Sequence, residues 1–429
     1  MMKPLKRLKV VLFCLAGICA TGAVAQTQDY HVNIQNEAVG RFLNEVTYTS
    51  KEDTSCVAYF LSPSDMRLDQ PLPVEVEVPE LYRAYIKSNN VNVQYSSAKS
   101  FSPESTDTVF VVKGNISAPV YDIEPGKEYS YKVSIYDMTV GWGKLTTEGP
   151  VRMIYVPSVS NVRDLGGWTT GDGRTVKYGK LLRGGELNGM HVADAADIEH
   201  LKQLGVAAEI DMRADWEDKD YGVRGVSVFG FKSAAEVENG EVASYLYTND
   251  SGQLLSNMTQ YAWLQRWRQE FNFIVSNLRA GRTVYFHCRW GADRTGYLAL
   301  LLEGLLGVTY DGLVKDYELT AFANINKRKE AIDPVIAFIN NLSGETLQEK
   351  FNTFWTKRVG VSQQDIDYFI DEMLDGEKPE SGIESSIAKV QEGPARTTAY
   401  DLLGRRVTGR RHGLVLLRQQ DGSVRKIMR

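Results

Sequence analysis

The middle of the chain alternates apolar runs of strand length with longer segments of helical periodicity. Residues 194–204 carry apolar side chains at helical spacing and end at Gly205. Residues 206–210 and 283–287 are short runs rich in apolar, β-branched or aromatic side chains, as is typical of buried strands. Further helices are predicted at residues 260–278, 297–306, 310–323, 334–342 and 363–374. The alternation predicts an α/β domain, residues 151–375, whose central sheet is flanked by helices. The aromatic residues of the 260–278 helix are predicted to belong to its core: Tyr261, Trp263, Trp267, Phe271 and Phe273.

A different pattern precedes this region. Short runs rich in Val, Tyr and Thr are separated by Pro, Gly, Asn and Asp, and they lie at residues 74–78, 91–95, 109–112 and 129–136. This texture predicts an all-β sandwich over residues 26–150. Residues 123–133 resemble the penultimate-strand turn of fibronectin type III and related immunoglobulin-like domains. We expect this domain to be a spacer or a wall packed on the α/β domain, with binding of a surface ligand as the alternative.

The first 25 residues have the layout of a secretory signal peptide. Four basic residues precede the apolar stretch 10–20, and Ala23-Val24-Ala25 ends the segment. The stretch is too short to favour a stable membrane span, and no other segment reaches the roughly 20 apolar residues that a span needs. Lipidation at Cys19 is the alternative, but Ile18 stands where a small residue is expected. The protein is therefore predicted to be exported, with a periplasmic, cell-surface or secreted location.

The end of the chain forms a third pattern. Residues 376–398 contain Pro, Gly and Ser and are predicted to be a flexible linker. Residues 399–429 regain strand character and predict a small β tail. The tail resembles the C-terminal sorting domains of secreted Bacteroidetes proteins. These read Tyr-Asp-Leu-x-Gly-Arg, then Gly-Ile-Tyr-Ile, then Asp-Gly-x-x-x-Lys, and the tail follows this order although residues 414–417 lack the usual tyrosine. The resemblance implies a secretion machinery as a partner.

The amino-acid composition identifies the chain as an ordinary globular protein and adds little else. The chain of 429 residues is 43% hydrophobic and 24% charged, which is ordinary for globular domains and compatible with two or three of them. The net charge of −5 provides no basic footprint for nucleic acid. Of four cysteines, two lie in the predicted signal peptide, so only Cys56 and Cys288 remain and a disulfide framework is excluded.

The candidate chemistry lies between the 283–287 strand and the helix that follows. Residues 287–296 read HCRWGADRTG. The unpaired N–H groups at a helix start, together with its dipole, bind anions such as phosphate. Arg294 adds a planar fork of donors for phosphoryl oxygens, and the same positive field favours the thiolate form of Cys288. Thr295 can donate its hydroxyl to the sulfur, while Gly291 and Gly296 permit a tight turn.

This segment resembles the active-site motif of the cysteine-based protein tyrosine phosphatases, Cys-x5-Arg followed by Ser or Thr. It is most similar to the bacterial tyrosine/serine phosphatases that have lipid-phosphatase relatives. Residues 161–167 (NVRDLGG), 182–187 (LRGGEL) and 210–213 (IDMR, with Glu217 beyond) resemble three further elements of that family. The predicted substrate-binding residues are Arg289, Trp290, Gly291, Ala292 and Gly296. His287 is predicted to orient the loop or tune its thiol. The charges of Arg163 and Asp164 are expected to lock a loop and not to touch substrate.

A phosphatase of this type needs a carboxylic acid for the leaving oxygen. Asp293 is the first candidate, because related phosphatases are thought to use the aspartate at this place. Asp211 is the second, since it ends a strand whose carboxyl end should face the phosphate loop. The alternative for Asp211 is a structural pairing with Arg213. No Cys/His cluster has metal-ligand spacing, so a hydrolase without metal or cofactor is predicted.

Three functions are compatible with these residues. The first is hydrolysis of phosphotyrosine-type monoesters through a cysteinyl-phosphate intermediate, and the second is hydrolysis of inositol phosphates or phosphoinositides at the same site. Relatives that act on lipids often carry Lys where this chain has Ala292, which favours the first; Arg289 and Trp290 partly offset this. The third is an inactive surface binding module, and the presence of Cys288, Asp293, Arg294 and Thr295 argues against it.

Overall fold

The computed structural model describes the chain in segments: residues 25–33, 35–61, 67–86, 90–98, 101, 106–111, 115–189, 192–215, 223–238, 240–249, 258–377, 398–400, 414–418 and 424–428. Two compact units are present. One comprises Met1–Ile34 and Pro73–Glu148, and the other comprises Gln35–Leu72 and Gly149–Arg429. The predicted signal peptide, except residue 25, and most of the predicted linker lie outside the described residues.

The first unit is all-β. Its larger sheet has the order β1-β8-β7-β4-β5, with β2 also paired to β8, and its smaller sheet pairs β3 with β6. The strands are β1 (Gln26–Thr27), β2 (Tyr30–Asn33), β3 (Val74–Glu77), β4 (Val91–Ser96), β5 (Asp107–Phe110), β6 (Ser117–Val120), β7 (Tyr129–Ile135) and β8 (Met138–Glu148), and a 3-10 helix, η2, spans Glu80–Tyr85. Alternate side chains of both sheets, such as Val76 and Val133, share one core. The immunoglobulin-like or fibronectin-like identity of this unit stays a prediction.

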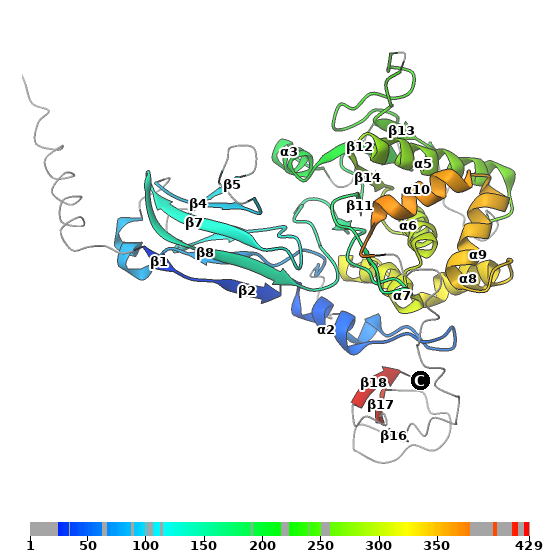
Figure 1. Ribbon diagram of the computed structural model, residues 1–429, viewed down its shortest axis with the longest axis horizontal. Helices are drawn as coiled ribbons and strands as arrows, with labels where there is room; N and C mark the ends of the chain where they lie inside the picture. Colours follow the sequence, from blue (N-terminus) through cyan, green and yellow to red (C-terminus); the bar gives the residue numbers. More distant parts are fainter. Residues whose placement is uncertain are drawn as a thin grey trace, which may run out of the picture. The chain divides into compact units, whose positions relative to one another are not determined.

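The second unit is mixed α/β, as predicted (Figure 1). Its main sheet has the order β13-β12-β14-β11-β9. Strands β13 (Tyr245–Tyr247), β12 (Val206–Asp211), β14 (Thr283–His287) and β11 (Leu181–Gly184) are parallel, and β9 (Arg163–Asp164) is antiparallel. Strand β14 is buried along its whole length. Strands β10 (Thr175–Val176) and β15 (Leu374–Asp375) form a separate pair.

Helices cover both faces of this sheet. They are α2 (Glu37–Glu45), α3 (Ala195–Gln203), α5 (Tyr261–Arg279), α6 (Asp293–Leu306), α7 (Tyr310–Leu319), α8 (Asp333–Asn340), α9 (Leu347–Thr353) and α10 (Gln363–Met373). Shorter helical turns are η1 (Val57–Tyr59), η4 (Thr320–Ala323), η5 (Lys329–Ala331) and the π-helical η6 (Phe354–Val359). Val284 and Phe286 of β14 pack with α5 and α6, whereas Tyr285 packs with Leu201 of α3 on the opposite face. None of the helices in the described segments is long and apolar enough to cross a membrane.

The boundary between the units differs from the predicted domain of residues 26–150. Residues 35–61 and 67–72, which we call the brace, pack with the α/β unit. Val39 and Phe42 of α2 are buried in its core, and the Tyr48 N–H donates a hydrogen bond of 2.7 Å to Asp311. The reason is local: α2 carries apolar side chains at helical spacing inside a region of strand texture.

The tail contains three strands, β16 (Thr398–Tyr400), β17 (Leu414–Arg418) and β18 (Val424–Met428), paired antiparallel in this order. They fall within the predicted β tail of residues 399–429, apart from the first residue of β16. The sorting function of the tail stays a prediction.

Candidate active site

Three adjacent parallel strands end at one edge of the sheet, and the candidate residues follow these ends. Gly184 of β11 and Asp211 of β12 are both in register with His287, the last residue of β14. Cys288 is therefore flanked by the segments that follow the two neighbouring strands. Ligands in α/β folds bind at such carboxyl ends.

The loop from Cys288 to Ala292 connects β14 to α6 and turns sharply at Gly291. Cys288 is a free cysteine with 2% exposure. Gly291 has φ +64°, and a Cβ atom there would lie 2.4 Å from the carbonyl carbon of Gly184. Only glycine combines this backbone conformation with so close an approach. Gly291, Ala292 and Gly296 are buried, and no side chain caps α6 at Ala292.

Two carbonyl groups of the loop, and the one just before it, accept hydrogen bonds from other segments. Met212 N–H donates to His287 O (2.9 Å), Glu186 N–H to Arg289 O (3.2 Å), and Asn161 Nδ2 (2.7 Å) and Arg183 Nη2 (3.1 Å) to Gly291 O. A planar trans peptide directs the next N–H away from its carbonyl. The N–H groups that follow these three carbonyls therefore face away from the donors. With the first turn of α6, they can form an anion cradle.

Arg294 and Thr295 belong to the first turn of α6. The partly buried Arg294 donates from Nη1 to the Met212 carbonyl at 3.0 Å, which holds its guanidinium at the carboxyl end of β12. Thr295 is fully buried, and among the described residues its Oγ1 has no hydrogen-bond partner. A buried hydroxyl in this condition costs free energy, so it calls for a functional reason.

Both ring nitrogens of His287 have a contact. Its Nε2 lies 3.0 Å from Oε1 of Glu209, and its Nδ1 lies 3.4 Å from the Cys288 carbonyl oxygen. Glu209 also accepts a hydrogen bond from the hydroxyl of Ser227. All three side chains are buried. The arrangement can orient the loop, as predicted for His287, whereas sequence reasoning missed Glu209 and Ser227.

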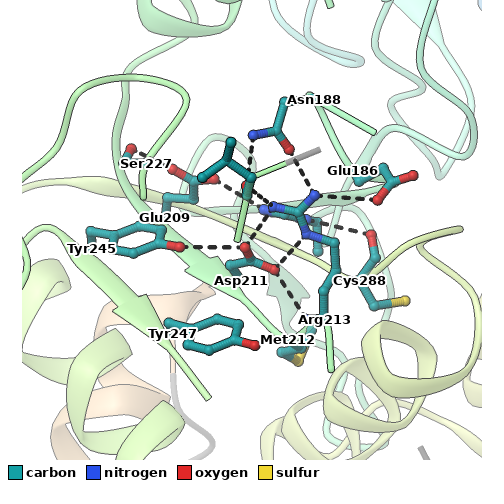
Figure 2. Close-up of polar contacts among 12 residues, drawn as sticks. Glu186, Asn188, Glu209, Asp211, Met212, Arg213, Ser227, Tyr245, Tyr247 and Cys288 are labelled. Carbon is teal, nitrogen blue, oxygen red and sulfur yellow. Dashed lines mark hydrogen bonds and ion pairs between the residues drawn. The ribbon is translucent and has the colours of Figure 1, made fainter. Parts of the chain in front are cut away.

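Asp211 is engaged in a buried ion pair with Arg213 (Figure 2). Arg213 donates from Nε at 2.9 Å and from Nη2 at 2.7 Å, and the Tyr245 hydroxyl lies 3.3 Å from the same carboxylate. Burial raises the pKa of Asp211, but the nearby His287 and the Arg213 hydrogen bonds outweigh it and hold this pKa below its ordinary value. The geometry supports the structural alternative for Asp211 and not the role of general acid.

Asp293 is far more accessible than Asp211. Its side chain is 47% exposed at the start of α6, and Lys327 Nζ lies 2.5 Å from its Oδ1. Asp293 is therefore open to solvent at the start of α6, whereas Asp211 is fully buried. Sequence reasoning missed Lys327, for which the only signal was a short basic run at residues 327–329.

The two remaining loop residues lie nearer the surface. Trp290 is 37% exposed and Arg289 is partly buried, and the Arg289 guanidinium lies 5.8 Å from the centre of the Trp290 ring. Both can contact a group attached to a phosphate bound in the loop. The described segments contain no cluster of three or more His, Cys, Asp or Glu side chains that could hold a metal ion.

The motif segments upstream of the loop support its backbone. Arg183 and Arg163 both bind the Asp316 carboxylate, and all three side chains are buried. Asp164 accepts hydrogen bonds from the Gly166 and Gly179 N–H groups at 2.9 and 2.7 Å. These charged residues are therefore structural, in agreement with the prediction for Arg163 and Asp164.

Comparisons with known proteins agree with this geometry. Residues 154–375 match the tyrosine phosphatase family. The "Putative tyrosine-protein phosphatase" of Cupriavidus necator is 31% identical over 166 residues, which cover 37% of this chain and 60% of that protein. The "Triple specificity protein phosphatase PtpB" of Mycobacterium tuberculosis is 26% identical over 191 residues, which cover 38% of this chain and 67% of that protein. The matched part thus spans less than two thirds of the first relative.

Proposed function

Because the chain belongs to the tyrosine phosphatase family, we propose that it hydrolyses phosphate monoesters of the phosphotyrosine type through Cys288. The observation that carries this proposal is the loop from Cys288 to Ala292. The Arg289 and Gly291 carbonyl groups are held by donors outside the loop, so the N–H groups that follow them can bind a phosphoryl group over the thiol.

In the first step the Cys288 thiolate attacks phosphorus, the sulfur–phosphorus bond forms and the bond to the leaving oxygen breaks. Asp293 donates its proton to that oxygen. Arg294 binds the phosphoryl oxygens with its planar donors. In the second step Asp293 takes a proton from water, whose oxygen attacks phosphorus and releases the thiolate. The Thr295 hydroxyl stabilises the departing sulfur by a hydrogen bond.

Two surrounding groups keep this machinery in place. The Glu209 carboxylate fixes the ring of His287, which precedes the nucleophile. The Asp211–Arg213 ion pair orders the segment that follows β12, where the Met212 carbonyl accepts from Arg294. We therefore propose a structural role for Asp211 and assign the acid and base steps to Asp293.

A second substrate class is favoured by the cations around the loop. Arg289 lies at the side of Trp290, and Lys327 reaches Asp293. Additional negative groups on the substrate, as in inositol phosphates or phosphoinositides, could bind these cations. The name of the mycobacterial relative says that it has triple specificity, which is compatible with a broad substrate range in this chain too.

The proposed site of action is outside the cytoplasm. Support comes from the signal-peptide pattern of residues 1–25 and from the resemblance of the tail to sorting domains. Substrates would then be phosphorylated molecules of the surroundings, and the secretion machinery would be a partner of the tail.

The test is hydrolysis of p-nitrophenyl phosphate by the mature protein and by Cys288→Ser, with reductant and EDTA present. We expect activity that persists in EDTA and falls by about 10⁴-fold or more in the variant. Phosphate release from a phosphotyrosyl peptide and from inositol hexakisphosphate then distinguishes the two substrate classes. Equal activity of Cys288→Ser and the unaltered protein would refute the proposal.

A further inference from the structure

Asp69 lies in the brace, outside the part of the chain that matches the family. Its side chain is fully buried. Arg67 donates to both carboxylate oxygens, from Nε and from Nη2, at 2.9 Å each. Oδ2 also accepts a hydrogen bond of 2.6 Å from the backbone N–H of Asn161. The carboxylate thus joins the brace to the first residue of the 161–167 motif.

Arg67 ties the same carboxylate to the chain just before Asn161. Its Nη1 donates to the Pro157 carbonyl at 3.1 Å, and its Nη2 donates to the Val159 carbonyl at 2.7 Å. Three attachments over residues 157–161 leave this segment little freedom to move relative to Asp69.

Asn161 has an unusual backbone conformation that depends on such support. Its φ is +64°, the left-handed region, which asparagine tolerates better than most residues. In this conformation its side-chain Nδ2 donates a hydrogen bond of 2.7 Å to the Gly291 carbonyl oxygen. Asn161 thereby donates a hydrogen bond from its backbone N–H to Asp69 and another from its side chain to the loop that would bind phosphate.

The orientation of one loop peptide depends on this contact. With the Gly291 carbonyl directed toward Asn161, the N–H of Ala292 points to the opposite side, where the phosphoryl group would bind. Rotation of this peptide would replace an N–H donor by a carbonyl oxygen, which repels an anion. Arg183 also donates to the Gly291 carbonyl, so loss of the Asn161 contact would weaken the orientation without abolishing it.

We propose that Asp69 is a positioning residue for phosphate binding and that it acts through Asn161 on the Gly291–Ala292 peptide. This inference rests on the proposed function. By this inference the brace helps to orient the phosphate-binding loop, although it supplies no catalytic residue.

The test compares Asp69→Ala with Tyr48→Phe. Tyr48 belongs to the same brace, and its hydroxyl bonds to Glu318 and to the Cys56 N–H, so its loss also weakens the packing of the brace. We expect Asp69→Ala to lower both kcat and the affinity for inorganic phosphate by about tenfold or more at a temperature where the protein is folded. Tyr48→Phe lowers the melting temperature but leaves both quantities unchanged.

Two further variants keep the test decisive. Asp69→Asn is measured in case Asp69→Ala does not fold. It retains the shape of the side chain and one acceptor oxygen, so it should lower kcat and phosphate affinity by a smaller factor. Asn161→Ala combined with Asp69→Asn should be no worse than Asn161→Ala alone, because Asp69 is proposed to act through the Asn161 side chain, which the single variant already lacks. Independent, multiplicative losses would overturn the proposed route through Asn161.

Phosphate affinity is also measured by calorimetry in a Cys288→Ser background, which does not depend on turnover. Unchanged affinity in the Asp69 variants, or equal losses in Tyr48→Phe, would overturn the inference while leaving the proposed function intact. Failure of the proposed function would instead appear as Cys288-independent hydrolysis in the unaltered protein.

Discussion

The ammonium nitrogen of Lys327 lies 2.5 Å from Oδ1 of Asp293, a residue 34 positions earlier in the chain. The contact holds the more accessible of the two candidate acids at the start of α6, directly after the loop from Cys288 to Ala292. A long-range ion pair thus links the loop before η5 to the proposed proton donor.

Asp293→Asn should lower kcat by about 100-fold for phenyl phosphate, whose leaving group needs a proton. The loss should be much smaller for p-nitrophenyl phosphate, whose leaving group is stable as an anion. The measurement is kcat over a series of aryl phosphates with leaving groups of increasing basicity. Asp211→Asn is the matched control and should lower stability without this dependence. The reverse assignment of effects would identify Asp211 as the acid.

Gly291→Ala should abolish phosphate binding, because the added methyl group would overlap the Gly184 backbone at 2.4 Å. Gly281→Ala is the control, since Gly281 also has a positive φ (+70°) but no atom within 4 Å of an added Cβ. It should lose only the roughly 1–2 kcal/mol that a left-handed alanine costs. The comparison uses urea unfolding and phosphate affinity. Equal stability and equal phosphate affinity of the two variants would show that phosphate binding does not depend on the close approach of Gly291 to Gly184.

Thr295→Val should stabilise the fold and impair the enzyme. The buried hydroxyl has no hydrogen-bond partner among the described residues, so its removal should raise the unfolding free energy by about 1 kcal/mol. The same change should slow release of the thiolate from the phosphoenzyme by roughly tenfold. Thr295→Ser keeps the hydroxyl and should keep the activity. A valine variant with full turnover would remove Thr295 from the mechanism.

Glu303 should make the free energy of unfolding fall as the pH rises. It is fully buried in α6, and burial together with the charge of Asp316 raises the pKa of Glu303 well above its ordinary value. Below the unfolded pKa of about 4.3 both states are protonated. Above it only the unfolded state ionises, so stability falls by about 1.4 kcal/mol per pH unit until the raised folded pKa is reached.

Above the unfolded pKa, Glu303 must take up a proton when the protein folds. Glu303→Gln removes this requirement, so the gain in unfolding free energy of the variant should grow with pH between about 4.5 and 7. Urea unfolding at several pH values measures the gain, with the exposed Glu52→Gln as the control for loss of a charge. A gain that stays constant with pH, or a loss of stability at neutral pH, would contradict the assignment of a protonated Glu303.

The sequence was sufficient for the parts of the site that are continuous in the chain. The strand at 283–287, the loop and the helix after it follow from local periodicity, and β14 has the predicted bounds. Aromatic residues of α5 were predicted as core, and Trp263, Trp267, Phe271 and Phe273 are buried. Tyr261 is 77% exposed because it stands at the first position of the helix, where the packed face has not yet begun.

The parts that depend on distant contacts were not predicted. Asp69 contacts Asn161, 92 residues later in the chain, and Glu209 contacts His287, 78 residues later. Neither pair leaves a periodic pattern or a motif of fixed spacing. For the same reason the sequence did not reveal that α2 leaves the β-textured region to join the α/β core.

The most direct test of the account is to trap the phosphoenzyme. Asp293→Asn is mixed with an excess of p-nitrophenyl phosphate, quenched with acid within milliseconds and digested for mass spectrometry. We expect a phosphoryl group on the peptide that contains Cys288, and none on this peptide in the Cys288→Ser variant. Turnover by the unaltered protein without phosphorylated Cys288, or with the phosphoryl group on another residue, would contradict catalysis by this thiolate.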